Sequence, residues 1–106
     1  MSADQYHEPV EELSKEIRTF ARMIMGLKEE AEAIDWYEQR MSVEKNKAAK
    51  AIMQNAQTEE MKHFSMDLEF LFRVKPQWRE IAQGVLFKQG DIVELGEKSE
   101  KKASKD

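Results

Sequence analysis

Apolar residues recur at steps of three and four along most of the chain, which is the period of an amphipathic helix. The first series consists of Val10, Leu13, Ile17, Phe20, Ile24, Leu27, Ala31 and Ile34. It predicts a long helix over residues 9–40, with Pro9 in the first turn, where a missing backbone N–H costs nothing. The second series consists of Ala48, Ala49, Ile52, Met53, Ala56, Phe70, Leu71 and Val74. It predicts a second long helix over residues 43–74.

Three residues mark the ends of the predicted elements. Ser42 is expected to cap the second helix, and Pro76 is expected to end it, because the residue before a proline disfavours the helical conformation. Pro76 also opens a shorter predicted helix over about residues 76–88, which Gly90 would terminate. Residues 96–106 are almost all Lys, Glu, Ser and Asp, so a charged, disordered tail is predicted there. Residues 1–95 would then form a single domain.

The composition favours long helices. Charged residues make up 36% of the 106 residues, and the four glycines and two prolines are too few to separate many strands. We therefore predict an all-α fold, an antiparallel two-helix hairpin followed by a short C-terminal helix. A hairpin of this size buries little apolar surface alone, so a homodimer that forms a four-helix bundle is expected.

Charge and cysteine content exclude several classes of protein. The net charge of −4 gives no indication of a nucleic-acid partner. There is no cysteine, which rules out disulfides, zinc–thiolate sites and thiol catalysis. No apolar run approaches the ~20 residues of a membrane span, and no signal peptide is recognisable. The expected location is the cytoplasm, with no membrane partner.

Glu60 and His63 are the candidate metal ligands of the second helix. Three residues apart, they lie on one helix face, so one carboxylate and one imidazole can bind the same divalent ion. On the first helix, Glu30 lies among apolar residues, where a carboxylate is costly unless it is paired, protonated or bound to a metal. Helix bundles that bind two irons or two manganese ions use two Glu-x-x-His pairs and two lone glutamates. One chain supplies half of this set, and a symmetric dimer would complete it.

The same residues permit other interpretations. Oxygen ligands with one imidazole suit iron or manganese, with zinc and cobalt able to bind in vitro. One alternative is therefore a di-manganese or peroxide-consuming bundle. Another is a non-enzymatic, structural helical-hairpin dimer in which Glu30, Glu60 and His63 merely form buried hydrogen bonds. Metal-dependent assembly and ferrous oxidation distinguish these alternatives.

Several segments resemble the encapsulated ferritin family, the ferritin-like ferroxidase cargo of encapsulin nanocompartments. The most specific is the block from Glu32 to Arg40, with its Asp-Trp-Tyr and Gln-Arg motifs. The segments that resemble the family are His7–Pro9, Glu29–Arg40, Glu59–His63 and Leu86–Phe87. The resemblance covers about residues 7–95.

The resemblance implies a ferroxidase, in which two ferrous ions bind at the dimer interface of a ferritin-like four-helix bundle and dioxygen oxidises them. On the family's pattern, Glu60 of each chain bridges the two irons, and Glu30 and His63 are terminal ligands. Tyr37 is implied to lie against the site, with Trp36 near it. Two further glutamates resemble acidic positions where ions enter or wait. They are Glu29 and Glu32.

The family also implies a ring of dimers, such as a decamer, housed in an encapsulin shell that stores the oxidised iron. Two features of this sequence depart from the family's pattern. Asn55 stands where bacterial members have a histidine. The sequence after Leu95 has no counterpart of the short Gly- and Leu-containing segment that targets such cargo to the shell.

Overall fold

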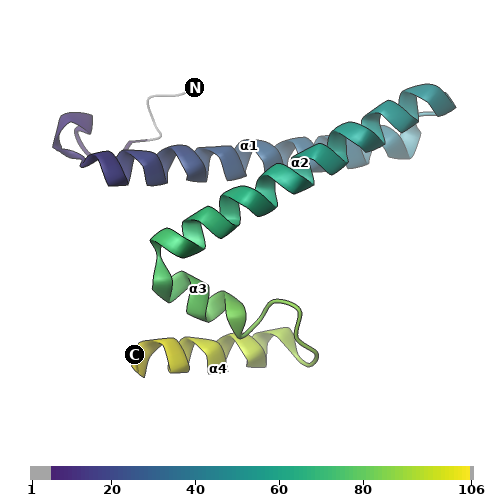
Figure 1. Ribbon diagram of the computed structural model, residues 1–106. Helices are drawn as coiled ribbons and strands as arrows, with labels where there is room; N and C mark the ends of the chain where they lie inside the picture. Colours follow the sequence, from purple (N-terminus) through teal and green to yellow (C-terminus); the bar gives the residue numbers. More distant parts are fainter. Residues whose placement is uncertain (1–5, 106) are drawn as a thin grey trace. The chain divides into compact units, whose positions relative to one another are not determined.

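The computed structural model describes residues 6–105, and this part of the chain is helical without a strand (Figure 1). A 3-10 turn, η2 (Val10–Glu12), precedes four α-helices. They are α1 (Lys15–Val43), α2 (Lys47–Val74), α3 (Pro76–Gln83) and α4 (Ile92–Lys105). The predicted all-α class is confirmed. No helix in residues 6–105 is both long and apolar enough to cross a membrane.

The first long helix begins later than predicted. Ser14 caps α1, because its hydroxyl accepts a hydrogen bond from the backbone N–H of Ile17 at 3.1 Å. Leu13 is extended and separates η2 from α1. Arg18 Nε donates to the carbonyl oxygen of Val10 at 3.1 Å and so ties η2 to the first turn of α1. A serine in this position competes with helix continuation, which is why the helix does not run unbroken from Pro9.

Asn46, rather than Ser42, caps the second long helix. Its Oδ1 accepts a hydrogen bond from the backbone N–H of Ala49 at 2.9 Å. Ser42 lies in the last turn of α1, where its hydroxyl donates to the carbonyl oxygen of Gln39 at 2.7 Å. The prediction for Ser42 is therefore wrong, and α2 starts a few residues later than predicted.

The described part of the chain divides into two compact units, residues 6–71 and 72–105. In the first unit α1 and α2 run antiparallel. Gln57 Nε2 donates to the carbonyl oxygen of Ile34 at 3.1 Å and to Glu38 Oε1 at 2.8 Å. Further from the turn, Gly26 of α1 faces Asp67 of α2. Contacts thus pair earlier residues of α1 with later residues of α2, which confirms the predicted antiparallel hairpin.

The hairpin leaves many large apolar side chains in solvent. Between residues 6 and 71, Met41 and Leu71 are the buried hydrophobic residues. The exposed large apolar residues of the two long helices up to Leu71 are Ile17, Trp36, Val43, Ile52, Met61, Met66 and Phe70. A chain with so little enclosed apolar surface needs further burial to be stable, as expected for a hairpin that associates.

In the second unit α3 packs against α4. Pro76 opens α3 as predicted, but the helix ends at Gln83 with Gly84 as its cap, before the predicted end near residue 88. Gly84 allows a close approach, because a Cβ there would lie 2.3 Å from Ser99 Oγ. The Ser99 hydroxyl donates to the carbonyl oxygen of Ile81 at 2.6 Å. This contact joins the end of α3 to the middle of α4.

Residues 96–105 are helical, so the predicted disordered tail is wrong there; Asp106 lies outside the described residues. Asp91 Oδ1 accepts a hydrogen bond from the backbone N–H of Glu94 at 3.0 Å and caps the helix. Ser99 and Ala103, four residues apart, are buried on one side of α4. A narrow face of small residues is therefore enough to fix this charged segment as a helix.

Candidate metal centre

Glu30, Glu60 and His63 come together from the two long helices of the first unit. Each offers one ligand atom, and these atoms all lie within 4.8 Å of one another. Glu30 comes from α1, and the other two lie one turn apart on α2. Glu30 and Glu60 are half-buried, whereas His63 is exposed. The hairpin thus brings together the three residues that the spacing singled out.

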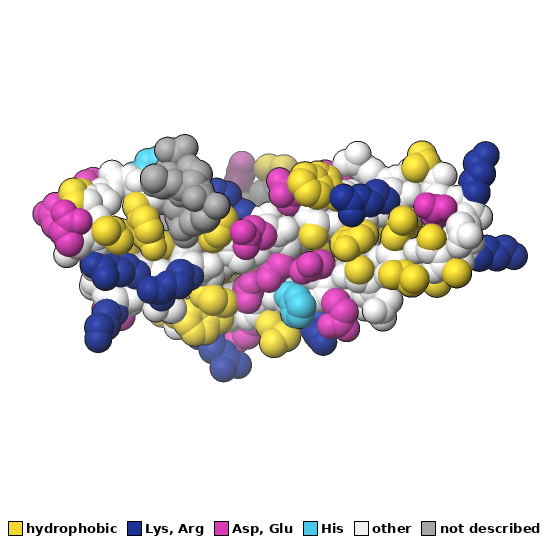
Figure 2. All heavy atoms as spheres, turned by 90° about the horizontal axis from the view of Figure 1, so that it is seen from above, with side chains coloured by type: hydrophobic (Ala, Val, Ile, Leu, Met, Phe, Trp, Pro, Cys, Tyr) yellow, Lys and Arg dark blue, Asp and Glu magenta, His cyan; other side chains and the backbone are white. Residues whose placement is uncertain are grey.

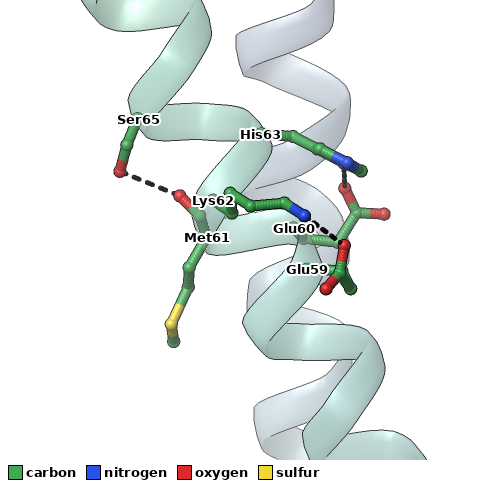
Figure 3. A network of polar contacts seen from close by, with 6 residues as sticks. All are labelled: Glu59, Glu60, Met61, Lys62, His63 and Ser65. Atoms are coloured by element: carbon green, nitrogen blue, oxygen red, sulfur yellow. Dashed lines mark hydrogen bonds and ion pairs between the residues drawn. The ribbon is translucent and has the colours of Figure 1, made fainter.

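The two ligands on α2 already point toward one another. His63 Nδ1 lies 3.4 Å from Glu60 Oε1, and Figure 3 shows both side chains on the same side of the helix. Lys62 Nζ pairs with Glu59 Oε2 at 2.9 Å and lowers the pKa of Glu59. Glu59 is thus paired with Lys62, whereas the neighbouring Glu60 carboxylate points toward His63.

Glu30 is held in an environment that disfavours its charge. Its Oε1 atom is shielded from water and has no hydrogen-bond partner. Burial, as the largest cause, raises the pKa of Glu30 from 4.5 to about 7. The Asp67 carboxyl adds to the rise through a hydrogen bond and its charge, Glu60 adds through its charge, and His63 opposes them. A cation bound here would relieve the same repulsion that now favours the proton.

Asp67 belongs to the surroundings of this site, although the sequence did not single it out as a site residue. It lies one turn beyond His63 on α2, its carboxyl approaches the same space beside Gly26 as that of Glu30, and it raises the pKa of Glu30. Its spacing from Glu60 and His63 was the available signal, since positions seven and four apart share a helix face. Nothing in the sequence indicated which residue of α1 it would meet.

The other predicted site residues are not among the three whose ligand atoms converge. Tyr37 is half-buried and Trp36 is 48% exposed. The guanidinium carbon of Arg40 lies 5.4 Å from the Tyr37 ring centroid and 5.9 Å from the Trp36 ring centroid. The remaining residues are exposed to solvent. They are Glu29 and Glu32 on α1 and Asn55 on α2.

The site is open to solvent, since His63 is exposed and Glu30 and Glu60 are half-buried. Figure 2 shows acidic side chains gathered beside a histidine, with hydrophobic side chains around them. A cavity of about 350 Å³ does exist in the second unit, between α3 and α4. Its lining contains none of the predicted site residues. The predicted ligands are therefore accessible to ions and to a second protein chain.

The donor set fits a divalent transition metal. Two carboxylates and one imidazole suit iron or manganese better than calcium or magnesium, which prefer oxygen alone. The unpartnered Oε1 atom of Glu30 also leaves a lone pair available for a cation. Three donors from one chain would leave a metal ion incompletely coordinated, and one glutamate with one Glu-x-x-His corresponds to half of the ligand set of two-metal carboxylate bundles.

The fold and this cluster together define a helical-hairpin protein of the ferritin-like class. The family described as EncFtn-like matches residues 5–89. Over 97 residues the chain is 43% identical to a ferritin-like protein of Thermotoga maritima, which covers 92% of this chain and 85% of that protein. Over 94 residues it is 36% identical to an encapsulated ferritin-like protein of Rhodospirillum rubrum, which covers 89% of this chain and 67% of that protein.

A solved structure shares both fold and sequence with this chain. The crystal structure of a Nitrosomonas europaea protein matches with a TM-score of 0.80 and 40% identity, over 84% of this chain and 99% of that chain. The chain belongs to the EncFtn-like family of encapsulated ferritins, as the sequence resemblance predicted. This membership gives it a ferritin-like function related to iron.

Proposed function

We propose that this protein is a ferroxidase that oxidises Fe(II) to Fe(III) with dioxygen at a di-iron site shared by two copies of the chain. The convergence of Glu30, Glu60 and His63, with ligand atoms within 4.8 Å, carries this proposal. One glutamate and one Glu-x-x-His are half of the ligand set of two-metal carboxylate bundles. Family membership supports iron as the metal.

Iron is the substrate of this reaction. In each chain Glu30 and His63 would be terminal ligands of one iron, and Glu60 would bridge to the other. Two ferrous ions supply two electrons, which with two protons reduce one dioxygen molecule to hydrogen peroxide. Carboxylate ligands favour the oxidation of Fe(II) to Fe(III), because negative charge stabilises Fe(III) more than Fe(II).

Residues around the ligands would guide iron and order the site. Glu29 and Glu32, both exposed on α1, extend the negative charge beyond Glu30 and would attract ferrous ions toward it. Tyr37 and Trp36 would border the metal site, and the contacts of Arg40 with both rings fix their positions.

Self-association would complete the centre. The exposed apolar residues of the hairpin favour a homodimer that forms a four-helix bundle, with two half-sites meeting at a two-fold axis. The dimers would form a ring, such as a decamer. The name of the Rhodospirillum rubrum relative supports residence inside an encapsulin nanocompartment, whose shell would store the ferric iron.

The test is aerobic oxidation of ferrous iron, followed by the near-ultraviolet absorbance of Fe(III). The wild type is compared with the triple variant Glu30→Ala, Glu60→Ala, His63→Ala. The control triple variant, His7→Ala, Glu8→Ala, Glu11→Ala, removes the same residue types from exposed positions outside the site. Native mass measurements with and without ferrous iron accompany each sample.

We expect the wild type and the control to oxidise iron well above buffer and to form dimers or rings when iron is added. The site variant should do neither. Assembly that is unchanged by iron or chelator, without oxidation of ferrous iron, would identify a structural dimer instead. Consumption of peroxide without ferrous oxidation would favour the di-manganese alternative.

A further inference from the structure

The cavity between α3 and α4 has no role in the proposed function, and its wall is positively charged. Its volume is about 350 Å³, within the range of sites that bind small molecules. The charged residues of the lining are three lysines and one glutamate, which give the wall a net charge of +2. They are Lys88, Lys98, Lys102 and Glu80.

Two of the lysines lie on the side of α4 that packs against α3. Lys98 and Lys102 follow Leu95 by three and seven residues, so the three share one helix face with Ser99. Ser99 is buried, and its hydroxyl donates to the carbonyl oxygen of Ile81 at 2.6 Å. This hydrogen bond fixes α4 on α3, so the two lysines are held by a helix of defined position.

The third lysine comes from the loop between the two helices. Lys88 is flanked by two residues in the left-handed region, Phe87 with φ of 63° and Gly90 with φ of 119°. A positive φ is uncommon for a residue other than glycine. Phe87 is fully exposed, so burial of its ring does not account for this conformation. The turned loop brings Lys88 to the wall that α3 and α4 form.

The positive charge of the cavity is not neutralised by the protein. Within residues 6–105, none of Lys88, Lys98 and Lys102 forms an ion pair. Residues 72–105 contain eight basic and five acidic residues, a net charge of +3, although the whole chain has a net charge of −4. Like charges around one cavity repel one another, and a bound anion would relieve this repulsion.

We propose that this cavity binds a small anion that carries a phosphate group. A phosphate ester has a charge close to −2 at neutral pH, which matches the +2 of the lining. Each ammonium group has three donors for the phosphate oxygens. The cavity also leaves room for a small organic group, with Leu95 as an apolar contact and the Gln83 amide as a hydrogen-bonding partner.

This site is independent of the metal centre and goes beyond the proposed function. The family match ends at residue 89, before α4 begins at Ile92. Lys98 and Lys102 therefore lie outside the segment matched to the family. Loss of the metal ligands should leave phosphate binding unchanged, and loss of these lysines should leave iron oxidation unchanged.

The experiment measures binding to the full chain by calorimetry, without metal and at a fixed chloride concentration. Inorganic phosphate and ribose 5-phosphate are the two probes, which distinguish a free phosphate from a phosphate ester. The site variant is Lys98→Gln with Lys102→Gln. The control is Lys101→Gln with Lys105→Gln, which removes two lysines of the same spacing on α4 that do not line the cavity. Circular dichroism compares the helix content of all samples, and amide chemical shifts locate the bound probe.

We expect saturable binding of at least one probe to the wild type and the control, with shifts confined to residues 80–102. The site variant should bind at least about tenfold more weakly, because it loses two charge-assisted contacts. Tighter binding of ribose 5-phosphate would identify a phosphate ester as the ligand, and equal binding would identify free phosphate. Equal losses in both variants would show general attraction to a basic surface and overturn the site. Absence of saturable binding to the wild type would overturn it as well.

Discussion

At the scale of single residues, Glu30 shows how the site is adapted to a cation. One of its oxygens is shielded from water without a partner, and its neighbours Asp67 and Glu60 are acidic. The neutral form of the carboxyl is favoured until a cation takes the place of the proton. The hairpin therefore loses some stability at this point, which a bound cation would restore.

Without metal, the protein is expected to lose stability as the pH rises from about 4.5 to about 7. The pKa of Glu30 is 4.5 in the unfolded reference and about 7 in the folded chain, so the folded state binds more protons within this window. The free energy of unfolding must then fall with rising pH. Glu30→Gln, which cannot ionise, should remove this part of the dependence.

Urea unfolding at several pH values, in the presence of chelator, measures the effect. Glu29→Gln is the matched control, because Glu29 is the exposed neighbour on the same helix. Parallel profiles for the wild type and Glu30→Gln would show that Glu30 does not carry the pH dependence.

A second residue-scale prediction concerns Gln57, which is 2% exposed and joins α2 to α1. Its Nε2 atom donates to the carbonyl oxygen of Ile34 and to Glu38 Oε1. Gln57→Ala should lower the free energy of unfolding by about 2 kcal/mol, because it removes two hydrogen bonds between the helices and leaves a gap at a buried position. Lys50→Ala, at an exposed position of the same helix, should change it by less than about 0.5 kcal/mol in urea unfolding.

At the scale of elements, the long helices could be predicted because their signals are local. Apolar residues at steps of three and four predicted the two long helices α1 and α2. Pro76 predicted the boundary between α2 and α3. Competing local signals were harder to rank. Ser42 was predicted as the cap of α2, but Asn46, a capping residue four positions later that the prediction passed over, takes this role.

The errors arose where distant residues decide the outcome. The charge-rich segment after Leu95 is helical because α4 packs on α3 through Ser99 and Ala103, a contact that composition does not reveal. By contrast, spacing within each helix was enough to single out the candidate ligands Glu30, Glu60 and His63, whose ligand atoms converge. The contact of Asp67 with Gly26 depends on the register between α1 and α2, which the sequence pattern leaves open.

The contact between α3 and α4 can be tested with two glycines. Gly84→Ala should separate α4 from α3, because the new Cβ would lie 2.3 Å from Ser99 Oγ and 2.5 Å from its Cβ. Gly96→Ala meets no atom within 4 Å and should stabilise α4 by up to about 1 kcal/mol. Amide hydrogen exchange measures both. Faster exchange across residues 92–105 is expected for Gly84→Ala and slower exchange for Gly96→Ala; equal protection in both would contradict the packing.

At the scale of the whole molecule, one proposed metal ligand, His63, shares a side of α2 with exposed apolar residues. Ile52 and Phe70 are separated from His63 by eleven and seven residues, close to whole numbers of helical turns, so all three lie on one side of α2. Ile52 is 71% and Phe70 39% exposed. A second copy placed against this side would cover apolar surface and bring its own ligands to the same point. Metal binding and association are therefore expected to be coupled.

The coupling predicts that a charge at Phe70 blocks metal-driven association while the hairpin stays folded. Phe70→Lys would place an ammonium group in the interface, where it must lose its hydration without a partner. Met61→Lys is the matched control, since Met61 is 44% exposed and lies on the opposite side of α2 from His63. Mass measurements with added Fe(II) or Co²⁺ should show dimers or rings for the wild type and Met61→Lys, and monomers for Phe70→Lys. Circular dichroism should show equal helix content in all three. If Phe70→Lys formed dimers at the metal concentration that dimerises the wild type, the interface would lie elsewhere on the hairpin. Association would then not involve the side of α2 that carries His63.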